Sequence, residues 1–297
     1  MKSIDLVFSS DDNYAQHLGV VLCSIFENKS NDCHINVHII DGGISPGNKD
    51  KLRILETKYS FEIKYLYLKI ENYKDLFISD HITHAAYYRI LIPDLLDEKI
   101  NKILYLDCDL IVLGDLIGLF ETNIDNYFIG AIEENGVGLK QNLNMNEESP
   151  YFNSGVMLIN LNKWREFNVS SKTLVFIREN PRKIKFWDQD ALNVILEEKC
   201  LILDKRFNYL TSEIEKTLRG RTNRIIKPII IHYSSHVKPW RFNGDNPFND
   251  EYFYYLEKTP WNNKIYQNKF FRIILIKMKK MIPHSIKKYV RKKLKHK

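Results

Sequence analysis

An α/β fold, in which helices cover a β-sheet, is predicted for this chain of 297 residues. Short apolar runs rich in β-branched residues alternate along it with stretches of helical period, which is the pattern of such folds. The alternation starts with an apolar run at residues 4–8 and a polar turn at residues 9–14, followed by Leu18, Val21 and Ile25 at helix spacing. A hydrophobic content of 44% and a charged content of 27% argue against disorder throughout the chain.

The same patterns predict the remaining elements. Further strands are expected at residues 35–40, 61–68, 102–106, 127–132, 155–159 and 225–232. Helices are expected at residues 48–58, at residues 84–92 where Pro93 ends the run, at residues 163–179 and at residues 189–197. Ligands of α/β sheets bind beside strand ends, so the functional residues are expected there.

The net charge of +7 is unevenly distributed along the chain. Residues 258–297 hold 14 Lys and Arg and no Asp or Glu, which leaves 30 basic against 37 acidic residues in residues 1–257. An acidic main domain argues against nucleic-acid binding, because a surface that follows phosphates needs positive charge. We expect a main domain at residues 1–245, which would carry any catalytic site, and an aromatic, basic segment at residues 246–297 that ends in an amphipathic helical tail.

The tail has the composition of a segment that binds a membrane surface. Its apolar run, residues 270–276, is far shorter than the roughly 20 residues that span a bilayer. Its apolar residues are interleaved with basic ones, which fits a helix lying on anionic lipid. A solvated, disordered end is the alternative. The start of the chain lacks a basic leader and long apolar core, so we expect a cytoplasmic protein that is peripheral on the inner face of the membrane.

Two carboxylates mark the clearest local motif. Asp107 and Asp109 flank one residue directly after an apolar strand, and alternation places them on the same side. Their oxygens can converge on one hard divalent cation. Taken alone, the motif is explained as well by two aspartates that solvate a turn.

His232 is the third candidate metal ligand, because it follows the apolar run at residues 228–231. Two carboxylates with one imidazole suit manganese better than zinc. A histidine that is simply hydrogen-bonded at a strand end is the alternative. The four cysteines lack paired metal spacing and are expected to be free thiols.

Several motifs in order along the chain resemble glycosyltransferase family 8, which includes bacterial lipopolysaccharide and lipooligosaccharide galactosyl- and glucosyltransferases and glycogenin. They lie at residues 8–14, 103–112, 151–164, 186–193, 206–209 and 231–240, and the resemblance covers nearly all of residues 1–245. It implies a GT-A fold, that is, one nucleotide-sugar-binding domain around a mixed central sheet. It also implies a UDP-hexose donor, manganese as the usual cofactor with magnesium as the alternative, and retention of the anomeric configuration.

The resemblance implies a role for each matching residue. Asp107, Asp109 and His232 match the family's metal ligands, and Lys238 matches its diphosphate-binding lysine. Residues expected to contact the donor are Ser10, Asp11, Asn13, Tyr14, Arg89, Asp107, Cys108, Ser154, Ser235 and Lys238. Structural roles are the alternative to donor binding: the polar turn before residue 15 can cap a helix, Lys238 can be a solvated loop lysine, and Arg89 can form a surface ion pair. Ser235 departs from a glycine that is frequent in the family, which leaves a backbone contact in doubt there.

The resemblance places the chemistry at Asn153, Asp188 and Gln189. Asp188 is expected to hold hexose hydroxyls, and Gln189 to lie beside the anomeric carbon, although Asp188 and Asp190 could also cap a helix. A neutral amide is a poor nucleophile, so front-face attack by the acceptor is favoured over a covalent intermediate. Residues 206–209 are assigned structural support only.

These observations predict a retaining transferase that moves galactose or glucose from a UDP-sugar to an oligosaccharide or lipid-linked acceptor, such as lipopolysaccharide. A metal-dependent nucleotidyltransferase is the alternative from another enzyme class, but no glycine-rich triphosphate motif is present. A self-glucosylating protein, or one that binds nucleotide sugars without turnover, is the third possibility.

Overall fold

The computed structural model describes residues 2–68, 85–136, 138–212, 227–234, 237–241 and 248–262. Its main sheet has the strand order β3-β2-β1-β4-β7-β6-β8. The strands are β1 (Lys2–Ser10), β2 (Cys33–Asp41), β3 (Ile63–Leu66), β4 (Lys102–Leu106), β6 (Ile129–Ala131), β7 (Val156–Asn160) and β8 (Cys200–Ile202). β1 pairs in parallel with β2 and β4, whereas β7 runs antiparallel to β4 and β6, so the sheet is mixed.

A second, small sheet packs beside the first and carries part of the site. It has the order β5-β10-β9, with β5 at Leu110–Val112, β9 at Tyr209–Leu210 and β10 at Ile230–His232. β10 runs antiparallel to β5 and parallel to β9. β5 begins only four residues after β4 ends, so one short turn joins the two sheets.

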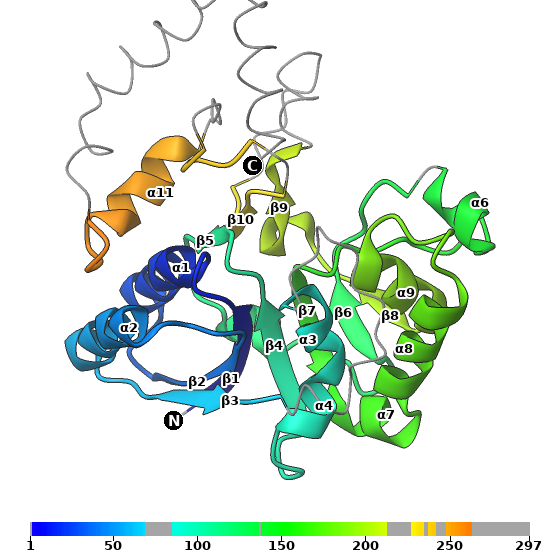
Figure 1. Ribbon diagram of the computed structural model, residues 1–297, viewed down its shortest axis with the longest axis horizontal. Coiled ribbons are helices and arrows are strands. Elements are labelled where there is room, and N and C mark those ends of the chain that lie inside the picture. Colours follow the sequence, from blue (N-terminus) through cyan, green and yellow to red (C-terminus); the bar gives the residue numbers. More distant parts are fainter. Residues whose placement is uncertain are drawn as a thin grey trace, which may run out of the picture.

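Each face of the main sheet has its own apolar core, because successive side chains of a strand point to opposite faces. On β1, Leu6 and Phe8 belong to the core shared with α1 (Ala15–Asn28), α2 (Pro46–Tyr59) and the small sheet. Val7 belongs to the opposite core, with Trp164 and Leu192. Helices on that side are α3 (Ala85–Tyr88), α4 (Ile92–Leu95), α7 (Leu161–Glu166), α8 (Val169–Glu179) and α9 (Trp187–Ile195). Figure 1 shows α1 and α2 beside β1 and β2, and α7 to α9 beside β6 and β8.

Two expected helices differ from the structure. The run expected at residues 163–179 is divided into α7 and α8, because Asn168 adopts a left-handed φ of 50° that no continuous helix allows. Pro93 does not end a helix: it lies in the first turn of α4, where its missing N–H has no intrahelical acceptor to lose. The strands β5, β8 and β9 and the helices α5 (Ile117–Phe120) and α6 (Leu139–Leu143) were not predicted, since each is two to five residues long.

The chain after residue 245 begins as part of the folded body. α11 (Asn249–Leu256) packs along α1, as Figure 1 also shows. Trp261 is buried, and its indole Nε1 donates to Asn48 Oδ1 of α2 at 2.9 Å. These residues therefore pack with the domain to which residues 1–245 were assigned. The tail expected after residue 262 lies outside the described residues, and no described helix is long and apolar enough to cross a membrane.

Candidate active site

A cavity of about 290 Å³ opens where β1 and β4 end. The strands are parallel neighbours, so their carboxyl ends meet at one edge of the sheet, where the sequence pattern placed the ligand. Its lining residues are Ser9, Ser10, Asp11, Tyr14, Arg89, Tyr105, Asp107, Cys108, Asp109, Trp187 and Asp188. Residues more than 170 positions apart in the sequence thus face one space.

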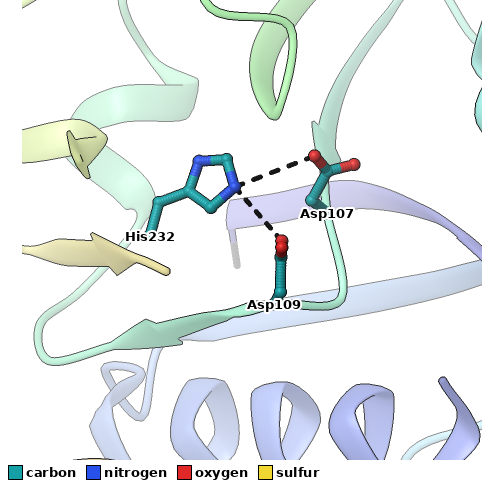
Figure 2. Close-up of side chains that lie close together, drawn as sticks. All are labelled: Asp107, Asp109 and His232. Atoms are coloured by element: carbon teal, nitrogen blue, oxygen red, sulfur yellow. Dashed lines mark ion pairs between the residues drawn. The ribbon is translucent and has the colours of Figure 1, made fainter. Parts of the chain in front are cut away.

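Asp107 and Asp109 line this cavity, and His232, which does not line it, points toward both carboxylates (Figure 2). One ligand atom from each lies within 4.8 Å of the others. His232 Nε2 lies 3.1 Å from Asp109 Oδ1 and 3.9 Å from Asp107 Oδ2. The antiparallel register of the small sheet causes this, because it places His232 opposite Leu110, the residue that follows Asp109.

The imidazole of His232 is held by a second hydrogen bond. Its Nδ1 lies 3.0 Å from Asn208 Oδ1, and a carbonyl oxygen can only accept, so Nδ1 carries the proton. Nε2 is then left with a lone pair aimed at the two carboxylates. Asn208 in turn donates from Nδ2 to Asn153 Oδ1 at 2.9 Å. The sequence analysis expects only structural support from Asn208. In the structure it orients His232 and links it to Asn153 through these two hydrogen bonds.

Gly155 leaves the space that this trio needs. A Cβ at this position would lie 2.3 Å from His232 Cε1 and 2.7 Å from Asp107 Oδ2. No side chain fits there without displacing a candidate ligand. Two carboxylates and one imidazole around a space kept open by a glycine suit a divalent cation such as Mn²⁺ or Mg²⁺.

Arg89 connects the candidate metal ligands to the candidate sugar ligand. Its Nη2 lies 2.9 Å from Asp107 Oδ1, and its Nε lies 3.0 Å from Asp188 Oδ2. Nη1 donates to Ser154 O at 2.8 Å and to Ser154 Oγ at 3.1 Å. Burial raises the pKa of Asp188 to about 6, although Arg89 opposes that rise. Arg89 is therefore no ordinary surface charge.

Lys238 pairs with the second of the two carboxylates. Its Nζ lies 2.5 Å from Asp109 Oδ2 and also donates to the carbonyl oxygen of Tyr233. Lys238 is 8% exposed, which is inconsistent with a solvated loop lysine. Although burial opposes it, the positive charge of Lys238 lowers the pKa of Asp109 below its ordinary value. Each of the two aspartates thus has a positively charged side chain beside it, Arg89 at Asp107 and Lys238 at Asp109.

Gln189 is held by hydrogen bonds at both ends of its amide. Its Oε1 accepts from Ser154 N at 3.1 Å and from Asn153 Nδ2 at 3.3 Å. Its Nε2 donates to Glu134 Oε2 and to Tyr151 Oη, both at 3.2 Å. None of Asn153, Ser154 and Gln189 lines the cavity itself, and Ser154 reaches it through Asp188, to which its Oγ donates at 3.2 Å.

Glu134 was missed by the sequence analysis. Its Oε2 accepts from Asn153 Nδ2 at 2.9 Å and from Gln189 Nε2, so it orients both expected catalytic side chains. It follows β6 by three residues, as Asp107 directly follows β4, so a carboxylate beyond a strand end was the available signal. Tyr105, whose Oη donates to Asp107 Oδ1 at 2.9 Å, and Trp187, in the cavity wall, were missed as well.

The polar turn before α1 contributes Ser10, Asp11 and Tyr14 to the cavity, but not Asn13. Asp11 Oδ1 accepts from the backbone N–H of Tyr14 at 3.0 Å, and Asn13 donates to the other carboxylate oxygen at 3.5 Å. The turn therefore fixes the start of α1 and lines the cavity at once. Cys108 faces inward: its Sγ donates to the carbonyl of Ser9 at 3.2 Å, and burial raises its thiol pKa.

The capping alternative holds for one of the two α9 aspartates. Asp190 Oδ2 accepts from the backbone N–H groups of Lys185 at 2.6 Å and Phe186 at 2.8 Å, so it stabilises the entry into the helix. Asp188 instead pairs with Arg89 in the cavity. Ser235 lies outside the described residues.

Comparison with known proteins agrees with this geometry. The family model of glycosyl transferase family 8 matches residues 5–244. General stress protein A of Bacillus subtilis is 38% identical over 86% of this chain and 94% of its own length. Lipopolysaccharide 1,3-galactosyltransferase of Salmonella typhimurium is 25% identical, over 87% of this chain and 79% of its own.

The solved structures show the same architecture. A crystal structure of the galactosyltransferase LgtC in complex with donor and acceptor sugar analogues superposes with a TM-score of 0.78 at 26% identity, covering 90% of this chain and all of that one. The mixed sheet and the added small sheet are therefore those of the GT-A fold expected from the motifs. With a family model that matches most of its length, this chain belongs to glycosyl transferase family 8.

Proposed function

We propose that this glycosyltransferase moves glucose or galactose from a UDP-sugar to a cell-surface glycan and retains the anomeric configuration. The observation that carries the proposal is the convergence of Asp107, Asp109 and His232 beside a cavity that also holds Tyr14 and Asp188. An aromatic ring for a base, ligands for a cation on a diphosphate, and a carboxylate for sugar hydroxyls occur there in one space. That set matches the parts of a nucleotide sugar.

A divalent cation, proposed to be Mn²⁺ with Mg²⁺ as the alternative, would be held by Asp107, Asp109 and His232. Bound there, it would neutralise negative charge on the leaving diphosphate. Arg89 and Lys238 flank the same carboxylates and would add positive charge around the phosphates, where their pre-oriented donors act without reorganisation. Asp188, fixed by Arg89 and Ser154, would hold hexose hydroxyls.

The arrangement of Gln189 favours front-face transfer. Its amide is neutral and has hydrogen bonds at both ends, so it offers neither a charge nor a free lone pair for covalent attack. In the proposed step the bond from the anomeric carbon to the phosphate oxygen breaks, and a bond to the acceptor oxygen forms on the same face. The acceptor's hydroxyl proton passes to the departing phosphate oxygen.

The acceptor is proposed to be lipopolysaccharide or a related surface glycan, since relatives bear the names lipopolysaccharide 1,3-galactosyltransferase and lipopolysaccharide 1,2-glucosyltransferase. We also propose that residues 263–297 attach the enzyme to anionic lipid on the inner face of the membrane. Each basic residue near such a surface contributes about 1 kcal/mol to the free energy of membrane binding. The basic residues of the tail together are therefore expected to hold the enzyme on anionic lipid at low salt.

Attachment is tested by sedimentation with anionic vesicles at low and high ionic strength. A chain that ends at residue 262 keeps Trp261 and should stay folded, remain active on a soluble acceptor and lose vesicle binding. A chain that ends at residue 260 lacks that buried indole and should unfold at a lower temperature. Equal sedimentation of full-length and 262-residue proteins would refute attachment by the tail.

Transfer is tested by incubation with UDP-glucose or UDP-galactose, Mn²⁺ and an oligosaccharide acceptor. Proton NMR of the first product should show an α-linkage from the α-linked donor. Asp107→Asn is the sharpest variant, because Arg89 keeps Asp188 as a partner and the asparagine Oδ1 can still accept from Tyr105. It should fold and lose most turnover. Incubation without acceptor distinguishes self-glucosylation, and full turnover in chelator would remove the metal assignment.

A further inference from the structure

Tyr252 of α11 is buried beside residues 238–241, which form the Lys238 turn, and packs against Trp240 of that turn. It is 1% exposed, and its hydroxyl lies 2.6 Å from His17 Nδ1 and accepts from Gln16 Nε2 at 3.2 Å. Because that hydroxyl already accepts from an amide, its single hydrogen is free to bond with His17 Nδ1. His17 then carries its own proton on Nε2.

His17, held by its hydrogen bond to Tyr252, stacks on Trp240. The two rings stack with centroids 3.6 Å apart and planes inclined by 23°, and Trp240 also packs against Tyr252 at 5.0 Å. Burial lowers the pKa of His17 to about 3, so the stacked ring is neutral at physiological pH. Tyr14, in the wall of the donor cavity, meets the same imidazole edge-on at 5.5 Å.

Trp240 lies two residues after Lys238, in a tight turn. The backbone N–H of Arg241 donates to Lys238 O at 3.0 Å and closes that turn around Trp240. The indole is therefore attached to the same four-residue turn that carries Lys238, so packing that fixes Trp240 also restrains this turn. From there the Lys238 ammonium reaches Asp109.

We propose that Tyr252, acting through His17 and Trp240, is a positioning residue that holds the Lys238 turn against the donor site. This inference rests on the proposed function, in which Lys238 contacts a diphosphate. α11 begins after residue 244, where the family match ends, so the helix was not assigned to the site by motif or by comparison. The proposal makes it part of the donor-binding machinery.

Tyr255 provides a matched control on the same helix. It is 6% exposed, and its hydroxyl accepts from Asn28 Nδ2 at 2.7 Å, at the far end of α1. Tyr252→Phe and Tyr255→Phe each remove one buried hydroxyl and keep the ring. A purely structural role for Tyr252 predicts that neither substitution changes the affinity for UDP.

The first readout is affinity for UDP with Mn²⁺, measured by titration calorimetry below the unfolding temperature of every variant. Tyr252→Phe should weaken binding by about fivefold, the range of one net hydrogen bond, and Tyr255→Phe by less than twofold. Trp240→Phe, at a partly buried position, should weaken it in the same direction. In the Lys238→Met background, Tyr252→Phe should have no further effect. Equal weakening in that background would overturn action through Lys238.

The second readout needs no ligand. Hydrogen exchange of the peptide that carries Lys238 and Arg241 should be faster in Tyr252→Phe than in wild type, and unchanged in Tyr255→Phe. If the two variants exchange alike, the inference is wrong even when UDP binds. If wild type does not bind UDP, the proposed function fails. Faster exchange in Tyr252→Phe alone would still support the positioning of the Lys238 turn by Tyr252.

Discussion

The ammonium group of Lys238 lies 2.5 Å from Oδ2 of Asp109, one of the two carboxylates proposed to bind a metal. Arg89 is placed in the same way on Asp107, at 2.9 Å. Arg89 is shared with Asp188, so three carboxylates face two positively charged side chains. A cation arriving alone is repelled at short range by Lys238 and Arg89, whereas a cation arriving with a diphosphate gives Lys238 and Arg89 new anionic partners.

Lys238→Met should therefore strengthen Mn²⁺ binding in the absence of nucleotide by about tenfold, because a charge repelling the metal at short range is removed. The same change should weaken UDP binding. Calorimetry with Mn²⁺ alone measures the first effect. Lys258→Met is the control, since Lys258 pairs with Glu27 in the last turn of α1 and should leave Mn²⁺ affinity unchanged. Weaker Mn²⁺ binding by Lys238→Met would contradict the competition.

Gly155→Ala should weaken the binding of Mn²⁺ and UDP by more than tenfold while the chain still folds. The added Cβ would lie 2.3 Å from His232 Cε1, so the imidazole must move away from the carboxylates. Gly118→Ala in α5 is the control, because a Cβ there meets no atom within 4 Å. Binding and melting temperature are measured for both. Unchanged affinity in Gly155→Ala would show that the site tolerates displacement of His232.

His17 should make the protein less stable as the pH falls below 6.5. Burial lowers its pKa to about 3 in the folded state, while the unfolded chain takes up the proton near its ordinary pKa of about 6.5. The unfolded state thus binds more protons between these values, so stability is full above pH 6.5 and is lost on acidification. Between pH 7 and pH 5, His17 should lower the free energy of unfolding by about 2 kcal/mol.

Urea unfolding of wild type and His17→Gln at both pH values measures this contribution. The difference in unfolding free energy between pH 7 and pH 5 should be smaller in the variant by about that amount. An equal pH dependence in the two proteins would mean that the pKa of His17 is the same in the folded and unfolded states, which contradicts its lowering by burial.

How far the sequence predicts this fold depends on the length of each element. The strand expected at residues 102–106 has the bounds of β4, because a continuous apolar run that ends at a polar residue marks a buried strand clearly. β9 has only two residues, Tyr209 and Leu210, and exists because β10 pairs with it. The break at Asn168 depends on tertiary packing, whereas the position of Pro93 in the first turn of α4 follows a local preference that the sequence analysis did not apply.

The site shows the same division. Asp107, Asp109 and His232 were chosen from strand ends and from resemblance, and the register between β5 and β10 brings them together. Glu134 and Tyr252 were not predicted. They act through hydrogen bonds between side chains far apart in the sequence, and such contacts follow from the fold rather than from spacing.

The central claim is that this cavity binds a UDP-hexose together with a divalent cation on Asp107, Asp109 and His232. Thermal unfolding with UDP-glucose, UDP-galactose, ADP-glucose and GDP-mannose, in Mn²⁺ or in chelator, tests it most directly. At a hundred times its dissociation constant, a ligand adds about 2.7 kcal/mol, or roughly 5 to 10 °C. The account predicts this shift for a UDP-sugar with Mn²⁺, and little in chelator or in Asp107→Asn. Equal shifts with all four nucleotide sugars, or a full shift in chelator, would contradict it.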